Sequence, residues 1–448
     1  MVNLIYDKSP IFLQNIFISL KGIQIYRQRY NKVYRKELKI LNEENEFNLQ
    51  KKRFKSFIKY TRKNSPFYSQ KLSHLKKEIS MSDIELLPML TKDEIREHVD
   101  EIVTRNKGLL PMGTSGTTGK KLIIYSHPYD ISRRIAYLDY FKAKHGVKKG
   151  MKRASMGGRT FVPEKQKSHI YWRHNYILNQ LLFSIYHASN ENIIYYIEEL
   201  NRFKPQSIDG VTTVIYRIAK YINKHSIELT FKPIAIFPTA ETLTVTVKSE
   251  IEKAFRCKVF DQYSSSEGAP FIVENDKGYY DICPATGYYE LERIEGNIYE
   301  ITVTSFYTTT TPLIRYRIGD AVELFDTLPE NYTQSDIKIK RIIGRKNDYL
   351  VSNEKGKVYS AILSATVRKT EGNFIECQFI QNKMDEVIIN FVIEGVNDKK
   401  TIEHSIKELM KVRFSESTEY NVRFVEELES TDGGKTRFII NNLNRELS

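Results

Sequence analysis

The sequence predicts an α/β protein with a large N-terminal part and a smaller α+β part at the C-terminus. Strands and helices alternate in the middle of the chain, which is typical of a sheet with parallel strands. Between Tyr279 and Phe325 one predicted strand follows another, which indicates an antiparallel region. The chain has 448 residues, of which 41% are hydrophobic, and this is enough for one large and one small domain.

The elements follow in order along the chain. The first hundred residues are rich in Lys, Glu and Leu and predict helices. Near Leu109 a Gly- and Thr-rich loop begins, and the apolar residues 122–125 after it predict a strand. Next come a helix at 211–222, a short buried strand at 233–237, a helix at 245–255 and a strand at 258–263. After Arg345 we expect helices from Tyr359 and Lys400 and strands near Phe374, Val387 and Val422.

The formal charge is +14, and basic residues gather around residues 51–59. Such a balance suits nucleic acid, an anionic membrane surface or a polyphosphate ligand, but a solvated basic helix face is favoured over any specific contact. The chain contains no RNA-recognition motif, so we expect no specific nucleic-acid partner. Cys257, Cys283 and Cys377 are far apart and follow no metal or disulfide spacing, which favours a reducing cytoplasm.

The N-terminal apolar run at residues 11–20 is interrupted by Gln14 and Asn15. It is too short to span a bilayer and lacks a signal-like cleavage site, so we expect no secretion signal and no transmembrane helix. Its apolar side chains can form one helix face above Lys21 and Arg27, so peripheral membrane association stays open. The residues of that face are Ile11, Phe12, Ile16 and Phe17.

The strongest motif is the loop at residues 113–121, Gly-Thr-Ser-Gly-Thr-Thr-Gly-Lys-Lys. Glycines allow a tight turn of backbone N–H donors, and hydroxyls and lysines complete a site for phosphate oxygens. The candidate residues are Thr114, Ser115, Gly116, Thr117, Thr118, Gly119 and Lys120. A Walker A loop does not fit, because Thr114 stands five residues before Gly119 and Lys121 follows Lys120. A flexible linker is the alternative, but seven Gly, Ser or Thr residues that end in two lysines and run into a strand argue against it.

This loop resembles the phosphate loop of the adenylate-forming superfamily, which comprises acyl-CoA synthetases, adenylation domains and luciferases. Later segments resemble the same family in the same order. In the segment 238–243, Ala240 and Glu241 would line the adenine pocket. In the segment 263–268, Tyr263 would pack on adenine, Ser266 would meet a phosphate or the carboxylate, and Glu267 would hold Mg2+. Ser264 replaces the usual glycine here, and Ser266 replaces threonine.

The remaining motifs of the family lie further downstream. Asp320, at the end of the segment 311–320, would accept hydrogen bonds from the ribose hydroxyls. Arg345 would contact ribose or phosphate, and Asn347 stands at the hinge where the family more often has Asp or Lys. Lys435, in a Gly-Lys loop, would bridge the substrate carboxylate and the α-phosphate.

The resemblance covers about residues 111–438 and is greatest to the phenylacetate–CoA ligase-like branch, within it to CapK-type proteins linked to capsular polysaccharide synthesis. It implies the adenylate-forming fold: a large domain, 1–345, with α/β sheets and a β subdomain, and a small mobile α+β domain, 346–448. Candidate acyl-pocket residues lie in the variable middle of the large domain. They are Gly158, Arg159, His174, Asp209 and Gly210, and each also has an ordinary structural explanation.

The implied reaction uses ATP and Mg2+ to convert a small carboxylic acid into its acyl-adenylate with release of pyrophosphate. The acyl group would then pass to CoA, a carrier-protein thiol or an amino sugar, and the sequence does not choose among them. An alternative is a non-catalytic nucleotide-binding component of a membrane-associated polysaccharide assembly. Nucleic-acid binding is a third hypothesis, based on net charge alone.

Overall fold

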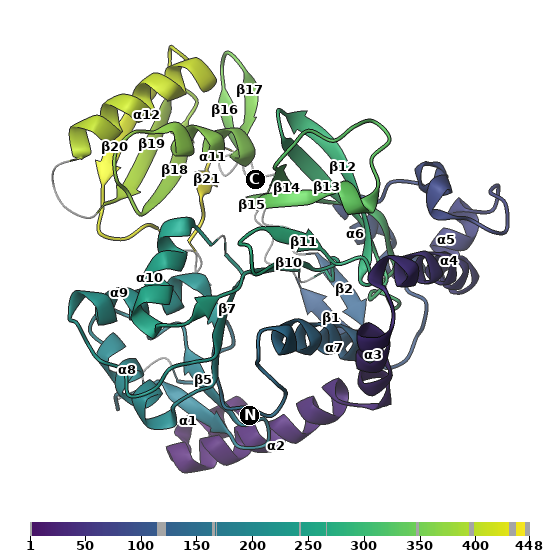
Figure 1. Cartoon of the computed structure of the whole chain (residues 1–448), viewed down its shortest axis with the longest axis horizontal. Coiled ribbons are helices and arrows are strands. Elements are labelled where there is room, and N and C mark those ends of the chain that lie inside the picture. Colours follow the sequence, from purple (N-terminus) through teal and green to yellow (C-terminus); the bar gives the residue numbers. More distant parts are fainter. Residues whose placement is uncertain are drawn as a thin grey trace.

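The structure is a computed structural model of the chain. It describes residues 2–113, 122–163, 166, 168–241, 243–265, 267–345, 349–393, 398–429 and 436–443. Two large sheets and their covering helices form most of the molecule, and a third sheet lies in the C-terminal part (Figure 1). This arrangement confirms the predicted α/β class, with a larger N-terminal and a smaller C-terminal part.

A six-stranded sheet has the order β4-β5-β3-β6-β7-β8. Its strands are β3 (Arg153–Gly157), β4 (Trp172–Asn175), β5 (Gln180–Ser184), β6 (Ser207–Val211), β7 (Ala235–Thr239) and β8 (Lys258–Val259). All neighbours run parallel except β4 and β5. Apolar side chains of α8 (Ile193–Phe203), α9 (Thr212–Lys224) and α10 (Val245–Phe255) cover one face. Tyr137 and Phe141 of α7 (Pro128–Lys144) pack on the other face.

A seven-stranded antiparallel sheet has the order β12-β13-β14-β15-β11-β10-β9. Its strands are β9 (Gln262–Tyr263), β10 (Ile272–Glu274), β11 (Tyr280–Ile282), β12 (Gly287–Glu295), β13 (Ile298–Ser305), β14 (Leu313–Leu324) and β15 (Lys338–Arg345), with a 3-10 turn η2 (Gln334–Asp336) before β15. Four helical segments pack their apolar side chains on this sheet: α4 (Glu46–Asn64), α5 (Pro66–Lys71), the 3-10 helix η1 (Met81–Leu86) and α6 (Lys92–Ile102). The prediction of an antiparallel region is confirmed.

The single strand predicted at 258–263 is wrong. The segment forms two short strands, β8 and β9, and each is the edge strand of a different sheet. Asp261 lies between them, and its side chain accepts hydrogen bonds from the Gln262 amide and the Tyr280 hydroxyl, both at 2.8 Å. The Asp261 amide donates to the Glu274 carboxylate at 3.0 Å. These contacts direct the chain out of the first sheet and into the second.

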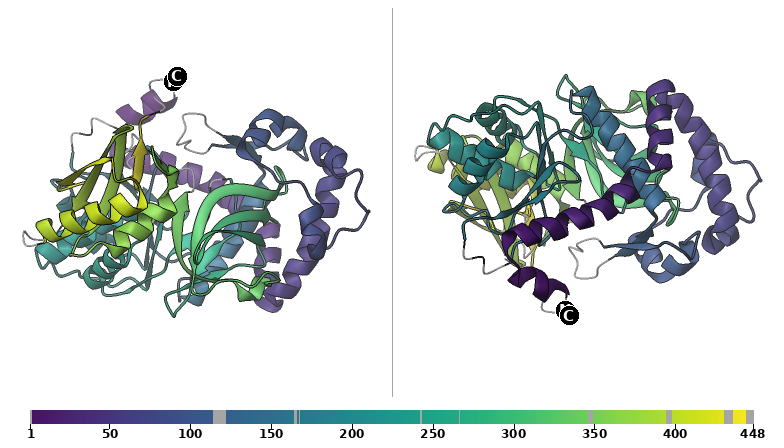
Figure 2. Two further views of the ribbon diagram at one scale, coloured as in Figure 1. Left: turned by 90° about the horizontal axis from the view of Figure 1, so that it is seen from above. Right: turned by 90° about the horizontal axis from the view of Figure 1, so that it is seen from below.

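The N-terminal helices are α1 (Val2–Lys8), α2 (Ile11–Arg29) and α3 (Lys32–Glu43). In the view from below, α1 and α2 lie in front of the rest of the molecule (Figure 2). A hairpin of β1 (Leu110–Gly113) and β2 (Ile123–Ser126) follows α6, and its register places Gly113 opposite Ile123. The hairpin therefore brackets the predicted phosphate loop. No helix in the described parts of the chain is long and apolar enough to cross a membrane.

The C-terminal part is an α+β unit, as predicted. It contains β16 (Tyr349–Ser352), β17 (Gly356–Tyr359), α11 (Ser360–Lys369), β18 (Glu376–Lys383), β19 (Glu386–Val392), α12 (Lys399–Arg413), β20 (Glu419–Phe424) and β21 (Ile439–Asn441). The last four strands form one sheet in the order β20-β19-β18-β21, with a core of its own. This unit contacts the large part through Ile375 and Val392, which belong to the same buried apolar cluster as side chains of α8–α10. The predicted boundary at residue 345 stays a prediction, because residues 346–348 lie outside the described segments.

Candidate active site

Two of the predicted nucleotide-binding residues touch each other. The Tyr263 hydroxyl, at the end of β9, donates a hydrogen bond of 2.5 Å to Oδ2 of Asp320 on β14. Burial, and then the Asp320 carboxylate, raises the pKa of Tyr263 well above its usual value. The phenol therefore stays protonated and fixes one carboxylate oxygen of Asp320. Asp320 also pairs across the sheet with the backbone of Arg345, whose side chain lies outside the described part.

Glu267 is buried, with 2% of its surface exposed. The Lys92 ammonium lies 3.9 Å from its Oε1. Lys92 is the first residue of α6, which Thr91 caps by accepting a hydrogen bond of 3.2 Å from the Glu94 amide. No local pattern in the sequence indicates that Lys92 lies beside the predicted metal ligand.

The turn that carries Glu267 is held by Arg134 of α7. The two terminal nitrogens of Arg134 donate to the carbonyl oxygens of Ala269 and Ser265, at 3.0 and 3.3 Å. Burial lowers the pKa of Arg134 to about 10, so its guanidinium remains charged at neutral pH. Gly268 has a φ of 92°, and a Cβ there would come within 2.6 Å of Thr308. The turn is therefore fixed both by hydrogen bonds and by close packing.

Asp130, also on α7, anchors the segment that leads into β14. Its Oδ1 accepts from the amide and hydroxyl of Thr309, at 3.2 and 2.5 Å. Its Oδ2 accepts from the amide and hydroxyl of Thr310, at 3.1 and 2.5 Å. The next residue, Thr311, accepts from the Tyr125 amide and donates to the Tyr125 carbonyl, at 3.0 and 2.7 Å. The hairpin around the predicted phosphate loop is thus tied to the strand that carries Asp320.

Ala240 and Glu241 follow β7, at the carboxyl edge of the six-stranded sheet. Ala240 has a φ of 74°, a left-handed conformation that turns the chain sharply after the strand. Glu241 Oε2 accepts from both the amide and the hydroxyl of Thr213, at 2.7 Å each, in the first turn of α9. Ligands of parallel α/β sheets bind at this edge, so the two residues lie where the family resemblance expects a nucleotide.

Gly158 and Arg159 follow β3 at the same edge. The Gly158 carbonyl accepts a hydrogen bond of 2.8 Å from the Tyr186 hydroxyl, and Arg159 is exposed. At Gly210, on β6, the fold itself requires glycine, because a Cβ there would lie 2.4 Å from the Met156 carbonyl oxygen. Gly210 therefore allows β3 and β6 to approach closely.

The structure does not bring His174 together with Asp209. His174 is on the edge strand β4, and two strands separate it from β6. Its Nε2 lies 3.6 Å from the Glu199 carboxylate, and its ring stacks on Tyr176 with centroids 5.6 Å apart. Asp209 accepts from the Lys142 ammonium at 2.8 Å and lies 3.3 Å from Nε of Arg153. His174 and Asp209 are thus engaged in contacts within the fold, which is the ordinary structural explanation that the sequence left open.

The other predicted site residues lie outside the described segments, and their roles stay predictions. They are the phosphate-loop residues Thr114, Ser115, Gly116, Thr117, Thr118, Gly119 and Lys120, together with Ser266, the hinge residue Asn347 and the catalytic candidate Lys435.

A magnesium ion brought by ATP fits the chemistry of the described residues. They contain no group of three or more His, Cys, Asp or Glu side chains that could enclose a metal ion. Mg2+ in nucleotide sites needs only one or two carboxylates, because phosphates and water complete its coordination. The buried carboxylate of Glu267 is such an oxygen donor, so it suits a shared metal site rather than a cage made by the protein alone.

Comparison with solved structures gives the class of the fold. A 2-hydroxyisobutyryl-CoA ligase in the postadenylation state with 2-HIB-AMP matches with a TM-score of 0.63, over 88% of this chain and 90% of that chain, at 18% identity. The same ligase with R3-HIB-AMP matches with a TM-score of 0.62, over the same shares, at 17% identity. The fold is that of the adenylate-forming CoA ligases, as predicted.

Sequence comparison gives the family. Protein CapK of Staphylococcus aureus is 54% identical over 448 residues, which cover 99% of this chain and 100% of that protein. The family model of the CapK C-terminal domain matches residues 350–442. The chain belongs to the CapK family.

Proposed function

We propose that this protein uses ATP to activate a carboxylic acid as its acyl-adenylate, with release of pyrophosphate. The observation that carries this proposal is the hydrogen bond between Tyr263 and Asp320. The segment that leads into the strand of Asp320 is also tied to the phosphate-loop hairpin, through Thr311 and Tyr125. The similar ligase structures contain acyl-AMP compounds, which supports the same half-reaction here.

The nucleotide would lie between the two sheets and the C-terminal unit. Asp320 would accept hydrogen bonds from the ribose hydroxyls, and Tyr263, Ala240 and Glu241 would surround the adenine. Backbone and hydroxyl donors of the loop 114–120, with Ser266, would hold the phosphates. Arg345 would add a positive charge at ribose or phosphate.

The reaction forms a bond between a carboxylate oxygen and the α-phosphorus of ATP. The bond between the α-phosphorus and the oxygen of the leaving pyrophosphate breaks. Lys435 would approach both groups and stabilise the negative charge that develops there. Glu267 would hold Mg2+, which neutralises phosphate charge. Catalysis would thus be chiefly positioning and charge stabilisation.

We propose that Gly158 and Arg159 border the acyl pocket and that Arg159 pairs with an anionic part of the substrate. The second step would move the acyl group to a thiol or amine, which attacks the acyl carbon and releases AMP. CoA is one acceptor, and a carrier protein or an amino sugar are others in surface polysaccharide synthesis. A swing of residues 346–448 about Asn347 would present the acceptor.

The test is pyrophosphate release from the purified protein with MgATP, across aryl, fatty, amino and sugar acids. Each active acid is repeated with Glu267→Gln and Lys435→Ala, and with Glu408→Gln and Lys411→Ala as matched surface controls from α12. Release that needs one class of acid, and that only the first two variants lose, supports adenylation. ATP binding without release for any acid favours the non-catalytic nucleotide-binding alternative, and absence of ATP binding overturns both.

A further inference from the structure

The outer face of α2 exposes large apolar side chains in a regular row. Phe12, Ile16 and Leu20 are 64%, 46% and 56% exposed, and Phe17 beside them is 41% exposed. Residues four apart lie on the same side of a helix, so the first three form one stripe. On the opposite side, Gln14 and Gly22 are buried against the protein. The helix therefore packs its inward face against the protein, and no element among the described residues covers its apolar stripe.

The charged residues of α2 itself are all basic. Lys21 and Arg27, both exposed, follow the apolar stripe along α2, and the Lys21 ammonium donates to Gln24 on the same helix at 2.6 Å. A helix with an apolar stripe and only basic charged residues has the pattern of helices that lie in the headgroup region of an anionic bilayer.

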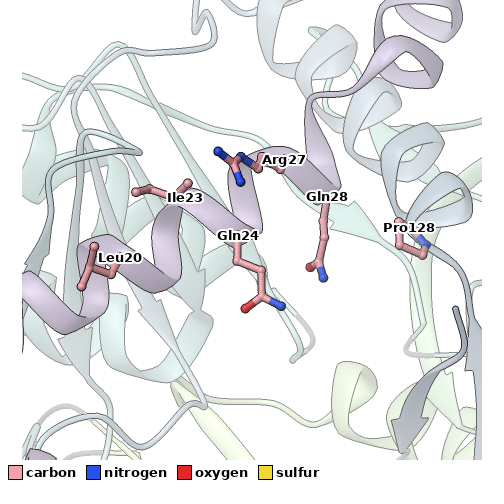
Figure 3. A pocket seen from close by; sticks show the side chains of 6 residues that line it. All are labelled: Leu20, Ile23, Gln24, Arg27, Gln28 and Pro128. Carbon is pink, nitrogen blue, oxygen red and sulfur yellow. The ribbon is translucent and has the colours of Figure 1, made fainter.

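A groove of about 460 Å³ continues the stripe toward α7, and its walls are Leu20, Ile23, Gln24, Arg27, Gln28 and Pro128. Figure 3 shows Gln24 and Gln28 pointing to the same side of the helix, with Pro128 beyond them. The amides of Gln24 and Gln28 and the guanidinium of Arg27 thus follow the apolar stripe along α2. Such an order fits a helix whose apolar part contacts acyl chains and whose polar part contacts lipid headgroups.

We propose that α2 docks this protein on a membrane surface rich in anionic phospholipid. Phe12, Ile16 and Leu20 enter the interface, while Lys21 and Arg27 meet lipid phosphates. A second copy of the chain is a poorer occupant, because a two-fold contact through this face brings the basic residues of both copies together. The proposal goes beyond the adenylation reaction and does not depend on it.

The experiment is flotation of the full chain with vesicles of phosphatidylglycerol and phosphatidylcholine, compared with phosphatidylcholine alone. The apolar variant is Phe12→Ser with Leu20→Ser. The matched control is Val245→Ser with Val412→Ser, two valines that are 86% and 73% exposed on other helices. A charge variant is Lys21→Gln with Arg27→Gln. All altered side chains are exposed, so melting temperatures should stay close to that of the unaltered protein.

We expect the unaltered protein and the valine control to float with the anionic vesicles. The apolar variant should lower the ratio of bound to free protein by about tenfold or more. The charge variant should lower it by about tenfold on anionic vesicles only, and salt should weaken binding in the same way.

Three outcomes would overturn the proposal: no flotation of the unaltered protein, equal flotation of the apolar variant, or a dimer in lipid-free solution that only the apolar variant abolishes. The last result would assign the stripe to contact between two copies. Pyrophosphate release is measured on every variant and should not change. A failure of docking is thereby separated from a failure of the adenylation proposal.

Discussion

The Tyr263–Asp320 hydrogen bond fixes the carboxylate that we propose for ribose binding. Tyr263→Phe keeps the ring for adenine but removes the donor at 2.5 Å. A hydrogen bond to a charged group contributes about 1.5–3 kcal/mol, so we expect ATP affinity to fall by about tenfold or more. Calorimetric titration with ATP measures this loss. The control is Tyr176→Phe, at an exposed tyrosine of another segment. If Tyr263→Phe lowers the melting temperature but leaves ATP affinity unchanged, Tyr263 has a purely structural role.

Arg134 positions the turn of Glu267 without being part of any motif. Arg134→Met removes the guanidinium that donates to the Ala269 and Ser265 carbonyl oxygens, and Ser265 keeps only the Gly268 amide, at 3.1 Å. We expect the free energy of unfolding to fall by roughly 2–4 kcal/mol and ATP affinity to fall with it. Urea unfolding and ATP titration measure the two effects. Arg134→Lys should rescue little, because one ammonium does not reproduce the forked geometry, and full rescue by lysine would refute the positioning role.

Single residues differ in how well the sequence reveals them. Tyr263, Glu267 and Asp320 stand in motifs, and the structure brings Tyr263 and Asp320 into contact; their roles at a nucleotide stay predictions. Arg134 and Asp130 lie inside an ordinary helix, so only the fold reveals that they hold the site. His174 and Asp209 drew attention as polar residues in a variable region, but their partners, Glu199 and Lys142 among them, come from segments that no local pattern connects.

At the scale of elements, the junction of β8 and β9 should respond to pH. Burial raises the pKa of Asp261 from 3.8 to about 6. The folded protein therefore holds this proton to higher pH than the unfolded chain, so the free energy of unfolding decreases as pH rises from about 4 to about 6. Asp261→Asn cannot titrate and should lack that decrease, which amounts to at most about 3 kcal/mol.

Urea unfolding of both proteins between pH 4 and pH 7 measures the difference, and other titrating groups cancel in the comparison. The asparagine oxygen can still accept from Gln262, so the junction should remain folded. Parallel stability curves for the two proteins would show that Asp261 does not titrate in this range.

The elements themselves were predicted well where a local pattern is sufficient. The helix predicted at 245–255 coincides with α10, and that at 211–222 lies within two residues of α9. The strand at 258–263 was predicted as one because Val259, Phe260 and Tyr263 are residue types typical of strands. Its division depends on Tyr280 and Glu274, which come later in the chain, so a reading of local sequence could not find it.

At the scale of the whole molecule, the C-terminal unit is attached by an ion pair and by apolar packing. Arg217 and Glu427 are 2.8 Å apart, but their side chains are 27% and 47% exposed, so Glu427→Gln should cost less than about 1 kcal/mol. Ile375 is buried among the side chains of α8–α10, and Ile375→Ala should cost roughly 2–4 kcal/mol. Urea unfolding ranks the two variants, and a larger effect of Glu427→Gln would contradict this order.

The overall architecture was predictable from the order of the elements. Strands that alternate with helices indicate the mostly parallel sheet, and consecutive strands indicate the antiparallel sheet. The contact between the C-terminal unit and α9 was not, because Ile375 and Val392 carry no sign of what they pack against. The boundary after Arg345 depends on the resemblance alone.

The short connection between β8 and β9 also bears on how the large part of the molecule unfolds. Only Phe260 and Asp261 separate the edge strands of the two sheets, and the three residue steps from Val259 to Gln262 span at most about 10 Å. Neither sheet can move far from the other without breaking edge pairing in at least one of them. The two sheets are thereby coupled into a single cooperative block, and a calorimetric scan should record them as one transition rather than two.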